Sequence, residues 1–290
     1  MPASPAPAGW ISLPASHLKE SGLIWLREPE SRNRQLLLHQ LMDGIYPHPF
    51  VIDDGTVRRL HFSLRLVQSE MRLDAPDTLS IAYTRAMLGF LLFHPIPKHV
   101  VIVGLGGGSL TKYCYRQLAR SRVTTVELME GVIACRDWFM IPPDDERLKI
   151  VQADAADYFA GEADGADAIL LDAYDEEGVA PQLCTAAFYA SLRRHLKPRG
   201  LLVANISGHG LTADTHIELI DEVFDGRKVV VDVMSDGNRI VYAFNDPTFP
   251  PPWTKLSRSA RELESAHPIE FGKLLRDMER SAQRARRKRR

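Results

Sequence analysis

The sequence predicts an α/β protein with a doubly wound, mostly parallel sheet of seven strands, preceded by a small N-terminal β-domain. Three observations support this fold class. From residue 99 onward, short apolar runs alternate with amphipathic segments, which is the pattern of strands separated by helices. Residues 100–103 are apolar throughout, as in a strand buried on both faces. Before residue 78, short strand-like runs are broken by turn residues instead.

The N-terminal part of the chain divides into a tail and a small domain. The first nine residues are rich in Pro and Ala and lack the basic and long apolar segments of a signal peptide, so we expect a flexible tail over residues 1–20. Residues 21–77 are expected to form the small β-rich domain, with a turn at the Asp-Asp-Gly sequence of residues 53–55. Its strand-like runs are residues 23–27, 34–38 and 60–67.

Residues 78–247 are expected to form the α/β domain, which opens with an amphipathic helix over residues 78–93. Six apolar runs predict strands over residues 100–103, 123–128, 148–152, 168–171, 201–206 and 229–234. Helices are expected over residues 109–119, 130–139, 186–196 and 214–224. Asp236 and Gly237 predict a hairpin into a last strand over residues 240–244, which makes one edge of the sheet antiparallel.

The composition restricts the class of protein. The 290 residues have a net charge of −1, with 45% hydrophobic and 25% charged residues, as in a soluble globular protein and unlike a disordered one. Three cysteines without a CxxC pair favour a reducing, cytoplasmic setting. The most apolar stretch, residues 86–93, is too short to cross a membrane, which takes about 20 residues. The pattern therefore predicts neither a membrane protein nor a disulfide framework.

The charge is distributed unevenly along the chain. Residues 248–290 are expected to form a charged, solvent-facing helical extension that ends in a basic tail. Without the six basic residues of that tail, the net charge of −1 becomes −7. We interpret the tail as a solvated, disordered end, and contact with nucleic acid is the alternative. The six residues are Arg284, Arg286, Arg287, Lys288, Arg289 and Arg290.

A glycine-rich turn follows the first strand of the α/β domain. In an open α/β sheet, ligands bind beyond the carboxyl ends of the strands. Gly104, Gly106 and Gly108 allow the backbone to pass close to a ligand, just ahead of a helix N-terminus. Ser109 stands where a dinucleotide-binding motif needs a glycine, which argues against a dehydrogenase. The remaining G-x-G-x-G form is usual in nucleotide-binding folds of the methyltransferase type.

Acids follow the next three strands. Glu127 follows the second, and its two oxygens match the two ribose hydroxyls of an adenosine. Asp154, next to the small Ala155, follows the third and suits the amino group of adenine. Asp172 and Asp175 follow the fourth. Together, these strand ends predict an adenosine-containing ligand.

This set of residues resembles the spermidine synthase family, the polyamine aminopropyltransferases, which share the class I fold of the methyltransferases that use S-adenosylmethionine. The resemblance runs from about residue 50 to residue 244, and a β-domain ahead of the nucleotide-binding fold is part of it. It is clearest in residues 104–108, 126–128, 153–155 and 172–175.

The resemblance implies a reaction and the residues that carry it. Asp172 would accept a proton, and Asp172 and Asp175 would hold the amine, in a pocket that Gln68, Tyr83 and Tyr174 line. The co-substrate would be decarboxylated S-adenosylmethionine, the acceptor a polyamine such as putrescine, and the assembly a homodimer. No HExxH and no paired CxxC occurs, so no metal is expected.

Several positions depart from the family pattern. Ser109 replaces an Asp that binds the aminopropyl ammonium of the donor, and Thr84 and Arg85 replace two polar pocket residues. The stretch of residues 234–238 lacks a substrate-binding Tyr, and no Asp follows Glu127-Leu128. Two alternatives therefore stand beside the aminopropyltransferase. They are a methyltransferase that uses intact S-adenosylmethionine on an unknown acceptor, and a nucleoside-binding protein without transfer activity.

Overall fold

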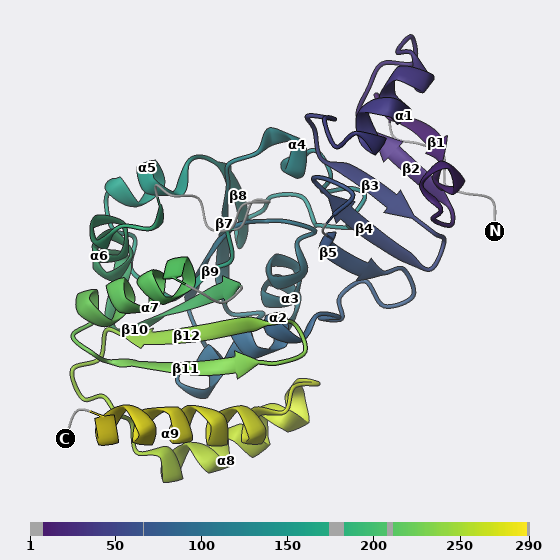
Figure 1. Ribbon diagram of the computed structural model, residues 1–290. Helices are drawn as coiled ribbons and strands as arrows, with labels where there is room; N and C mark the ends of the chain where they lie inside the picture. Colours follow the sequence, from purple (N-terminus) through teal and green to yellow (C-terminus); the bar gives the residue numbers. More distant parts are fainter. Residues whose placement is uncertain (1–7, 66, 174–182, 208–210, 289–290) are drawn as a thin grey trace.

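The computed structural model describes residues 8–65, 67–173, 183–207 and 211–288. They form an antiparallel N-terminal sheet and a larger, mostly parallel sheet covered by helices on both faces (Figure 1). The five strands of the N-terminal sheet pair in chain order. They are β1 (Ile11–Pro14), β2 (Leu23–Leu26), β3 (Phe50–Asp53), β4 (Val57–His61) and β5 (Val67–Arg72).

The second sheet has seven strands in the order β11-β12-β10-β9-β6-β7-β8. In this sheet β12 pairs antiparallel with both β10 and β11, and the other four pairs are parallel, which confirms the predicted class: a doubly wound, mostly parallel sheet with one antiparallel edge. The chain winds outward from β6 in both directions, so the order reverses between β6 and β9, where open α/β sheets bind ligands. The strands are β6 (His99–Val103), β7 (Arg122–Glu127), β8 (Leu148–Gln152), β9 (Ala166–Leu171), β10 (Leu196–Ser207), β11 (Lys228–Val233) and β12 (Asn238–Phe244).

Helices pack on both faces of this sheet. One face carries the 3-10 turn η2 together with α2, α3, α8 and α9, and the other carries α5, α6 and α7. The former set is α2 (Ala82–Met87), η2 (Leu88–Leu92), α3 (Ser109–Gln117), α8 (Trp253–Ala266) and α9 (Phe271–Lys288). The remaining helices are η1 (Ala15–Leu18), α1 (Arg34–Met42), α4 (Glu130–Ile133), α5 (Ala155–Ala160), α6 (Ala186–His195) and α7 (Leu211–Val223).

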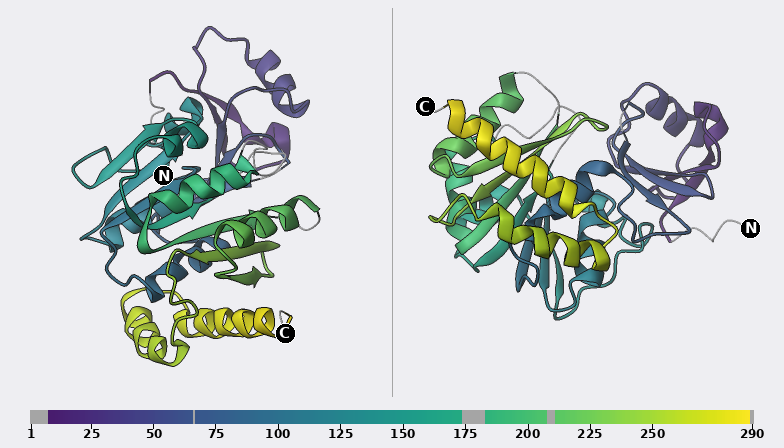
Figure 2. Two further views of the ribbon diagram at one scale, coloured as in Figure 1. Left: turned by 90° about the vertical axis from the view of Figure 1, so that its left-hand side faces the viewer. Right: turned by 90° about the horizontal axis from the view of Figure 1, so that it is seen from below.

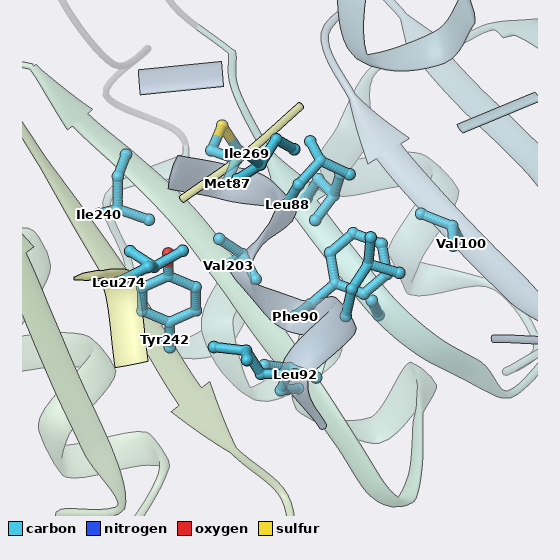
Figure 3. Close-up of a cluster of buried hydrophobic side chains, with 14 of the residues drawn as sticks. Met87, Leu88, Phe90, Leu92, Val100, Val203, Ile240, Tyr242, Ile269 and Leu274 are labelled. Carbon is cyan, nitrogen blue, oxygen red and sulfur yellow. The ribbon is translucent and has the colours of Figure 1, made fainter. Parts of the chain in front are cut away.

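The largest hydrophobic core lies between the sheet and η2 (Figure 3). Phe90 and Leu92 of η2 face Val203 of β10, and Tyr242 of β12 lies beside Leu274 of α9. Each of these side chains is buried, so the removal of any one leaves a cavity that costs about 2–5 kcal/mol. The core fixes the sheet edge and α2 relative to one another, and both contribute to the site described below.

The C-terminal helices close this core from outside. Viewed from below, α9 lies across β11 at the edge of the sheet, and α8 packs beside α9 and against η2 (Figure 2, right). Phe271, Leu275 and Met278 of α9 are buried, so the expectation of a wholly solvent-facing extension was wrong. Residues 284–288 continue α9 as helix and are not a disordered end, and the last two residues lie outside the described range.

Other expectations differ from the structure near the N-terminus. Residues 34–38 form the start of helix α1, not a strand, because Asn33 caps it by accepting from the N–H groups of Gln35 and Leu36. The strand expected over residues 60–67 ends at His61, and β5 starts only at Val67. Part of the expected tail is also folded, since β1 pairs with β2 and η1 follows it.

Two predicted helices of the α/β domain are shorter than expected. The helix expected over residues 78–93 begins at Ala82 and tightens into the 3-10 turn η2 from Leu88. The helix expected over residues 130–139 is regular only to Ile133 and continues as turns. Helix α5, which Asp154 caps, was not predicted.

Candidate active site

The glycine-rich loop links β6 to α3 and packs against three other segments. A Cβ at Gly104, where φ is +95°, would lie 2.1 Å from the backbone oxygen of Asp172. A Cβ at Gly108 would lie 2.4 Å from Ile141, and one at Gly107 would lie 2.6 Å from Ser69 Oγ of β5. These three glycines therefore permit close packing within the protein. They bring the end of β6, the end of β9 and the N-terminal domain together.

Gly106 differs from its neighbours in the loop. Its φ is +49°, and the nearest atom to an added Cβ, Ser69 Cβ, is 3.8 Å away. Among the three predicted glycines, it alone faces space that another group can approach. The N-terminus of α3 follows it, and Gly108 caps that helix without a side-chain hydrogen bond.

Glu127 ends β7 beside the glycine loop. Its Oε2 accepts from the N–H of Leu105, and its Oε1 accepts from the N–H of Met129, both over 2.8 Å. The side chain is buried and its two oxygens are held at a fixed position. Because an ionised carboxylate has about four acceptor positions, the two that remain suit a diol.

Asp154 follows β8 and caps α5. Its Oδ1 accepts from the N–H of Ala156 over 2.7 Å, and Ala155 beside it is buried. Asp154 is half-buried, and its Oδ2 has no hydrogen-bond partner within the described ranges. Glu127 and Asp154 thus end neighbouring strands of the sheet, as the sequence predicts for an adenosine site.

Asp172 follows β9 at the point where the strand order reverses. Its Oδ1 accepts from Asn205 Nδ2 over 2.8 Å, and its Oδ2 accepts from the Tyr83 hydroxyl over 3.2 Å. Burial raises the pKa of the Asp172 carboxyl above its ordinary value, while the hydrogen bonds from Asn205 and Tyr83 lower it in part. The result is a carboxylate held at both oxygens, with a higher affinity for a proton than an exposed aspartate.

Asn205 and Tyr83, which hold Asp172, are each hydrogen-bonded to a further residue. Asn238, at the start of β12, donates from Nδ2 to Asn205 Oδ1 over 2.7 Å. Asp236, in the turn before β12, accepts at Oδ2 from the N–H of Tyr83 over 2.7 Å. The turn between β11 and β12 is therefore connected to both sides of Asp172.

The structure joins some of the predicted residues by hydrogen bonds and not others. Tyr83 meets Asp172 directly, as expected. Gln68 lies half-buried in β5 at a register shift between β4 and β5, and no hydrogen bond joins it to Tyr83 or Asp172 among the described residues. A shift of this kind re-aims a side chain near an active site. Tyr174 and Asp175 lie outside the described residues.

The positions that depart from the family pattern have clear structural settings. Arg85 Nη1 donates to the backbone oxygens of Leu79 and Ser80, so its guanidinium is bound to the segment ahead of α2. Thr84 is buried and donates to the oxygen of Ile81 over 2.7 Å. Ser109 is the first residue of α3 and is half-buried.

Asn205, Asp236 and Asn238 were not singled out from the sequence. One signal was available, since Asn205 is a polar residue within the apolar run of residues 201–206 and lies near its end. Asp236 and Asn238 were interpreted only as parts of a turn. Their proximity to Asp172 depends on strand register, which the sequence pattern does not provide.

The sheet order, the glycine loop and the acids at successive strand ends define the class I fold of the S-adenosylmethionine-dependent methyltransferases. Solved structures agree with this fold. Human methyltransferase-like protein 13 in complex with SAH matches 64% of this chain and 92% of its own, with 23% identity and a TM-score of 0.59. A probable spermidine synthase from Corynebacterium glutamicum matches 73% and 84%, with 21% identity and a TM-score of 0.61.

Sequence comparison resolves the family within this fold. The family model of the spermine/spermidine synthase domain matches residues 80–235. The polyamine aminopropyltransferase of Chromobacterium violaceum is 34% identical over 230 residues, which cover 79% of this chain and 88% of that protein. The chain belongs to the spermine/spermidine synthase family and is an enzyme of the transferase class, as the resemblance implied.

Two further features of the described ranges concern membrane spans and metal ligands. No helix there is long and apolar enough to cross a membrane. Within the same ranges, no three or more His, Cys, Asp or Glu residues are grouped so that they hold a metal ion. The three cysteines are free thiols, and burial raises the pKa of Cys114 and Cys135 to about 12.

Proposed function

We propose that this protein transfers the aminopropyl group of decarboxylated S-adenosylmethionine to an amine of a polyamine such as putrescine. The observation that carries the proposal is Asp172, a carboxylate at the switch point of a nucleoside-binding sheet, held at both oxygens by Asn205 and Tyr83. Membership in the spermine/spermidine synthase family supports the reaction.

The donor binds along the ends of β6, β7 and β8. Gly106 leaves room for it at the loop, Glu127 accepts hydrogen bonds from the two ribose hydroxyls, and Asp154 Oδ2 accepts one from the adenine amino group. The positive sulfur then lies near Asp172, since Gly104 contacts the backbone of that residue.

The transfer is a displacement at carbon. The lone pair of the acceptor nitrogen forms a bond to the carbon beside the positive sulfur. The carbon–sulfur bond breaks, and its electron pair stays on sulfur, so neutral methylthioadenosine leaves. The nitrogen loses one proton to become a secondary amine. Most of the acceleration comes from holding the two reactants in line.

Asp172 takes the proton from the acceptor. An alkylamine, like the lysine ammonium, is mostly protonated at neutral pH and is then no nucleophile. Burial raises the pKa of Asp172 and so brings it closer to the pKa of the amine, which favours proton transfer. From the family motif we assign Asp175, Tyr174 and Gln68 to hold the amine with Tyr83.

The nature of the donor is tested by mass spectrometry of the products. The purified protein is incubated with putrescine and either decarboxylated or intact S-adenosylmethionine. We expect spermidine and methylthioadenosine from the decarboxylated donor only. Ser109 stands where the family has an aspartate that binds the aminopropyl ammonium of the donor. Its neutral side chain favours a methyltransferase, which uses the intact donor, as a second candidate. Methylated amine and S-adenosylhomocysteine from the intact donor would establish it in place of the first.

We also propose a homodimer that works in a reducing compartment. Leu36, Met42 and Ile45, on and just after α1, are 47%, 58% and 65% exposed, and exposed apolar side chains of this kind suit a subunit interface. The three free thiols suit the cytoplasm. Light scattering measures the mass of the wild type and of Ile45→Lys. A wild-type mass of one chain would exclude the dimer, and a variant that stays dimeric would exclude this surface.

A further inference from the structure

We propose that the turn between β11 and β12 positions the Asp172 carboxylate through two hydrogen-bonded branches, one to each oxygen. Asn238 acts through Asn205 on Oδ1, and Asp236 acts through Tyr83 on Oδ2. The catalytic meaning of this arrangement rests on the proposed function. The arrangement itself consists of four hydrogen bonds between residues far apart in the sequence.

The first branch sets the orientation of an amide. An asparagine side chain presents an acceptor on one side and donors on the other. Asn238 Nδ2 donates to Asn205 Oδ1, which leaves Asn205 Nδ2 to face Asp172 Oδ1. Without the Asn238 donor, the Asn205 amide loses one of the contacts that set this orientation. An amide turned the other way would present its oxygen to the carboxylate and replace a favourable contact with a repulsive one.

Strand register brings the members of this branch together. In the β10–β12 pair, Asn205 lies opposite Ile240. Asn238 is two residues from Ile240 and therefore lies on the same face of the sheet as Asn205. In the β9–β10 pair, Leu171 lies beside Ala204, so Asp172 follows next to Asn205. Asn205 and Asn238 are both buried, which makes an unpaired amide costly.

The second branch fixes the start of a helix. Helix α2 has no side-chain cap of its own, since its N-cap residue is Ile81. Asp236 supplies an acceptor from outside by binding the N–H of Tyr83 in the first turn. Ser235 Oγ donates to the other oxygen of Asp236 over 2.7 Å. The position of the Tyr83 ring, and thus of its hydroxyl, depends on this anchor.

The two branches have a common consequence for Asp172. Each oxygen accepts one directed hydrogen bond, which fixes the carboxylate plane and aims its remaining lone pairs at the acceptor amine. Donors to a carboxylate stabilise its charged form and lower its pKa. Loss of either branch is therefore expected to misplace the Asp172 carboxylate, which slows transfer, and to raise its pKa, which moves the acidic limb of the pH profile to higher pH.

The first branch is tested with Asn238→Leu, which keeps a side chain branched at Cγ and removes the hydrogen-bond donor. Asp232→Asn, an exposed change on the same hairpin, is the matched control. We expect kcat of Asn238→Leu to fall about tenfold, which is the size of one lost hydrogen bond. We also expect the acidic limb of its pH profile of kcat/KM to move to higher pH. Asp232→Asn is expected to leave both unchanged. An unshifted limb in Asn238→Leu would overturn the first branch.

A double-mutant cycle tests whether Asn238 acts through Asn205. In an Asn205→Ala background, Asn238→Leu is expected to cause no further loss of kcat, because the relay is already broken. Losses that multiply would show that Asn238 acts separately and would contradict the relay. Thermal melts of all variants identify any that fail to fold.

The second branch is tested by comparing Asp236→Asn with Asp236→Ala. Asparagine keeps an acceptor oxygen for the N–H of Tyr83, and alanine does not. We expect Asp236→Asn to retain most of the kcat that Asp236→Ala loses. Equal losses would show that the charge of Asp236 matters and not its acceptor, which would overturn a positioning role.

A measurement without turnover separates the relay from the proposed function. The carbon-13 carboxyl signal of Asp172, assigned by its loss in Asp172→Asn, is titrated in the wild type and in Asn238→Leu. We expect a higher pKa in the variant. Equal pKa values would overturn the relay even in an active enzyme. A raised pKa in a protein that makes no spermidine would uphold the relay and refute the proposed function.

Discussion

The Tyr83 hydroxyl donates a hydrogen bond of 3.2 Å to Asp172 Oδ2, although 89 positions separate the two residues in the chain. Tyr83 lies in the first turn of α2, ahead of the strands of the larger sheet, and Asp172 follows the end of β9. The contact therefore joins the start of the α/β domain to its switch point.

Tyr83→Phe removes this donor and keeps the ring. We expect kcat to fall about fivefold to tenfold, and the acidic limb of the rate profile to move to higher pH, because the lost hydrogen bond had lowered the pKa of Asp172. Tyr115→Phe is the matched control, since Tyr115 lies near the end of α3, away from the site, and donates to Asp145. Identical pH profiles for the wild type and Tyr83→Phe would contradict this role.

Glu127→Gln tests the nucleoside site. A glutamine amide has one acceptor oxygen, so it cannot serve the N–H groups of Leu105 and Met129 as well as a ribose diol. We expect the Kd for methylthioadenosine, measured by calorimetry, to rise about tenfold or more. Glu130→Gln removes an exposed carboxylate three residues later and serves as control. Equal affinities of Glu127→Gln and the wild type would exclude Glu127 from the site.

Much of the fold was predictable because the central strands of the larger sheet are buried on both faces. Residues 100–103 and 168–171 coincide with most of β6 and of β9 for this reason. Residues 34–38 were misassigned because three consecutive leucines fit a strand as well as a helix. The deciding feature, the Asn33 cap, is a local hydrogen bond that apolar periodicity does not report.

The candidate site was predictable only where it follows the strand ends. Glu127, Asp154 and Asp172 are each an acid at or just beyond the end of a strand, so their common edge follows from the fold. Asn205 and Asn238 join the site through the pairing of β10 with β12. A shift of one residue in that pairing would turn Asn238 to the other face of the sheet.

Lys112 links the glycine-loop helix to the N-terminal domain, and its burial gives a signed prediction for stability. Its Nζ is fully buried and donates to the backbone oxygens of Pro76 and Phe139 over 2.7 Å. Burial lowers its pKa from 10.5 to about 8 in the folded protein. Below that pH the cost of burying the charge is fully present. As pH rises toward 10.5, the unfolded chain keeps a proton that the folded chain has lost, so stability increases.

The test is the difference in unfolding free energy between the wild type and Lys112→Met, measured in urea. We expect the unfolding free energy of the wild type to rise relative to that of Lys112→Met by up to about 3 kcal/mol between neutral pH and pH 10.5. Lys149→Met, at an exposed site on β8, provides the control. A difference that stays constant with pH would show that Lys112 does not titrate in the folded protein.

The central claim is that Asp172 is the group that accepts the proton of the amine. The most direct measurement compares spermidine formation by the wild type and by Asp172→Asn, with donor affinity measured by calorimetry on the same samples. We predict that Asp172→Asn loses transfer by about 100-fold or more while the Kd of the donor changes little. Spermidine formation at the wild-type rate by Asp172→Asn would contradict the account.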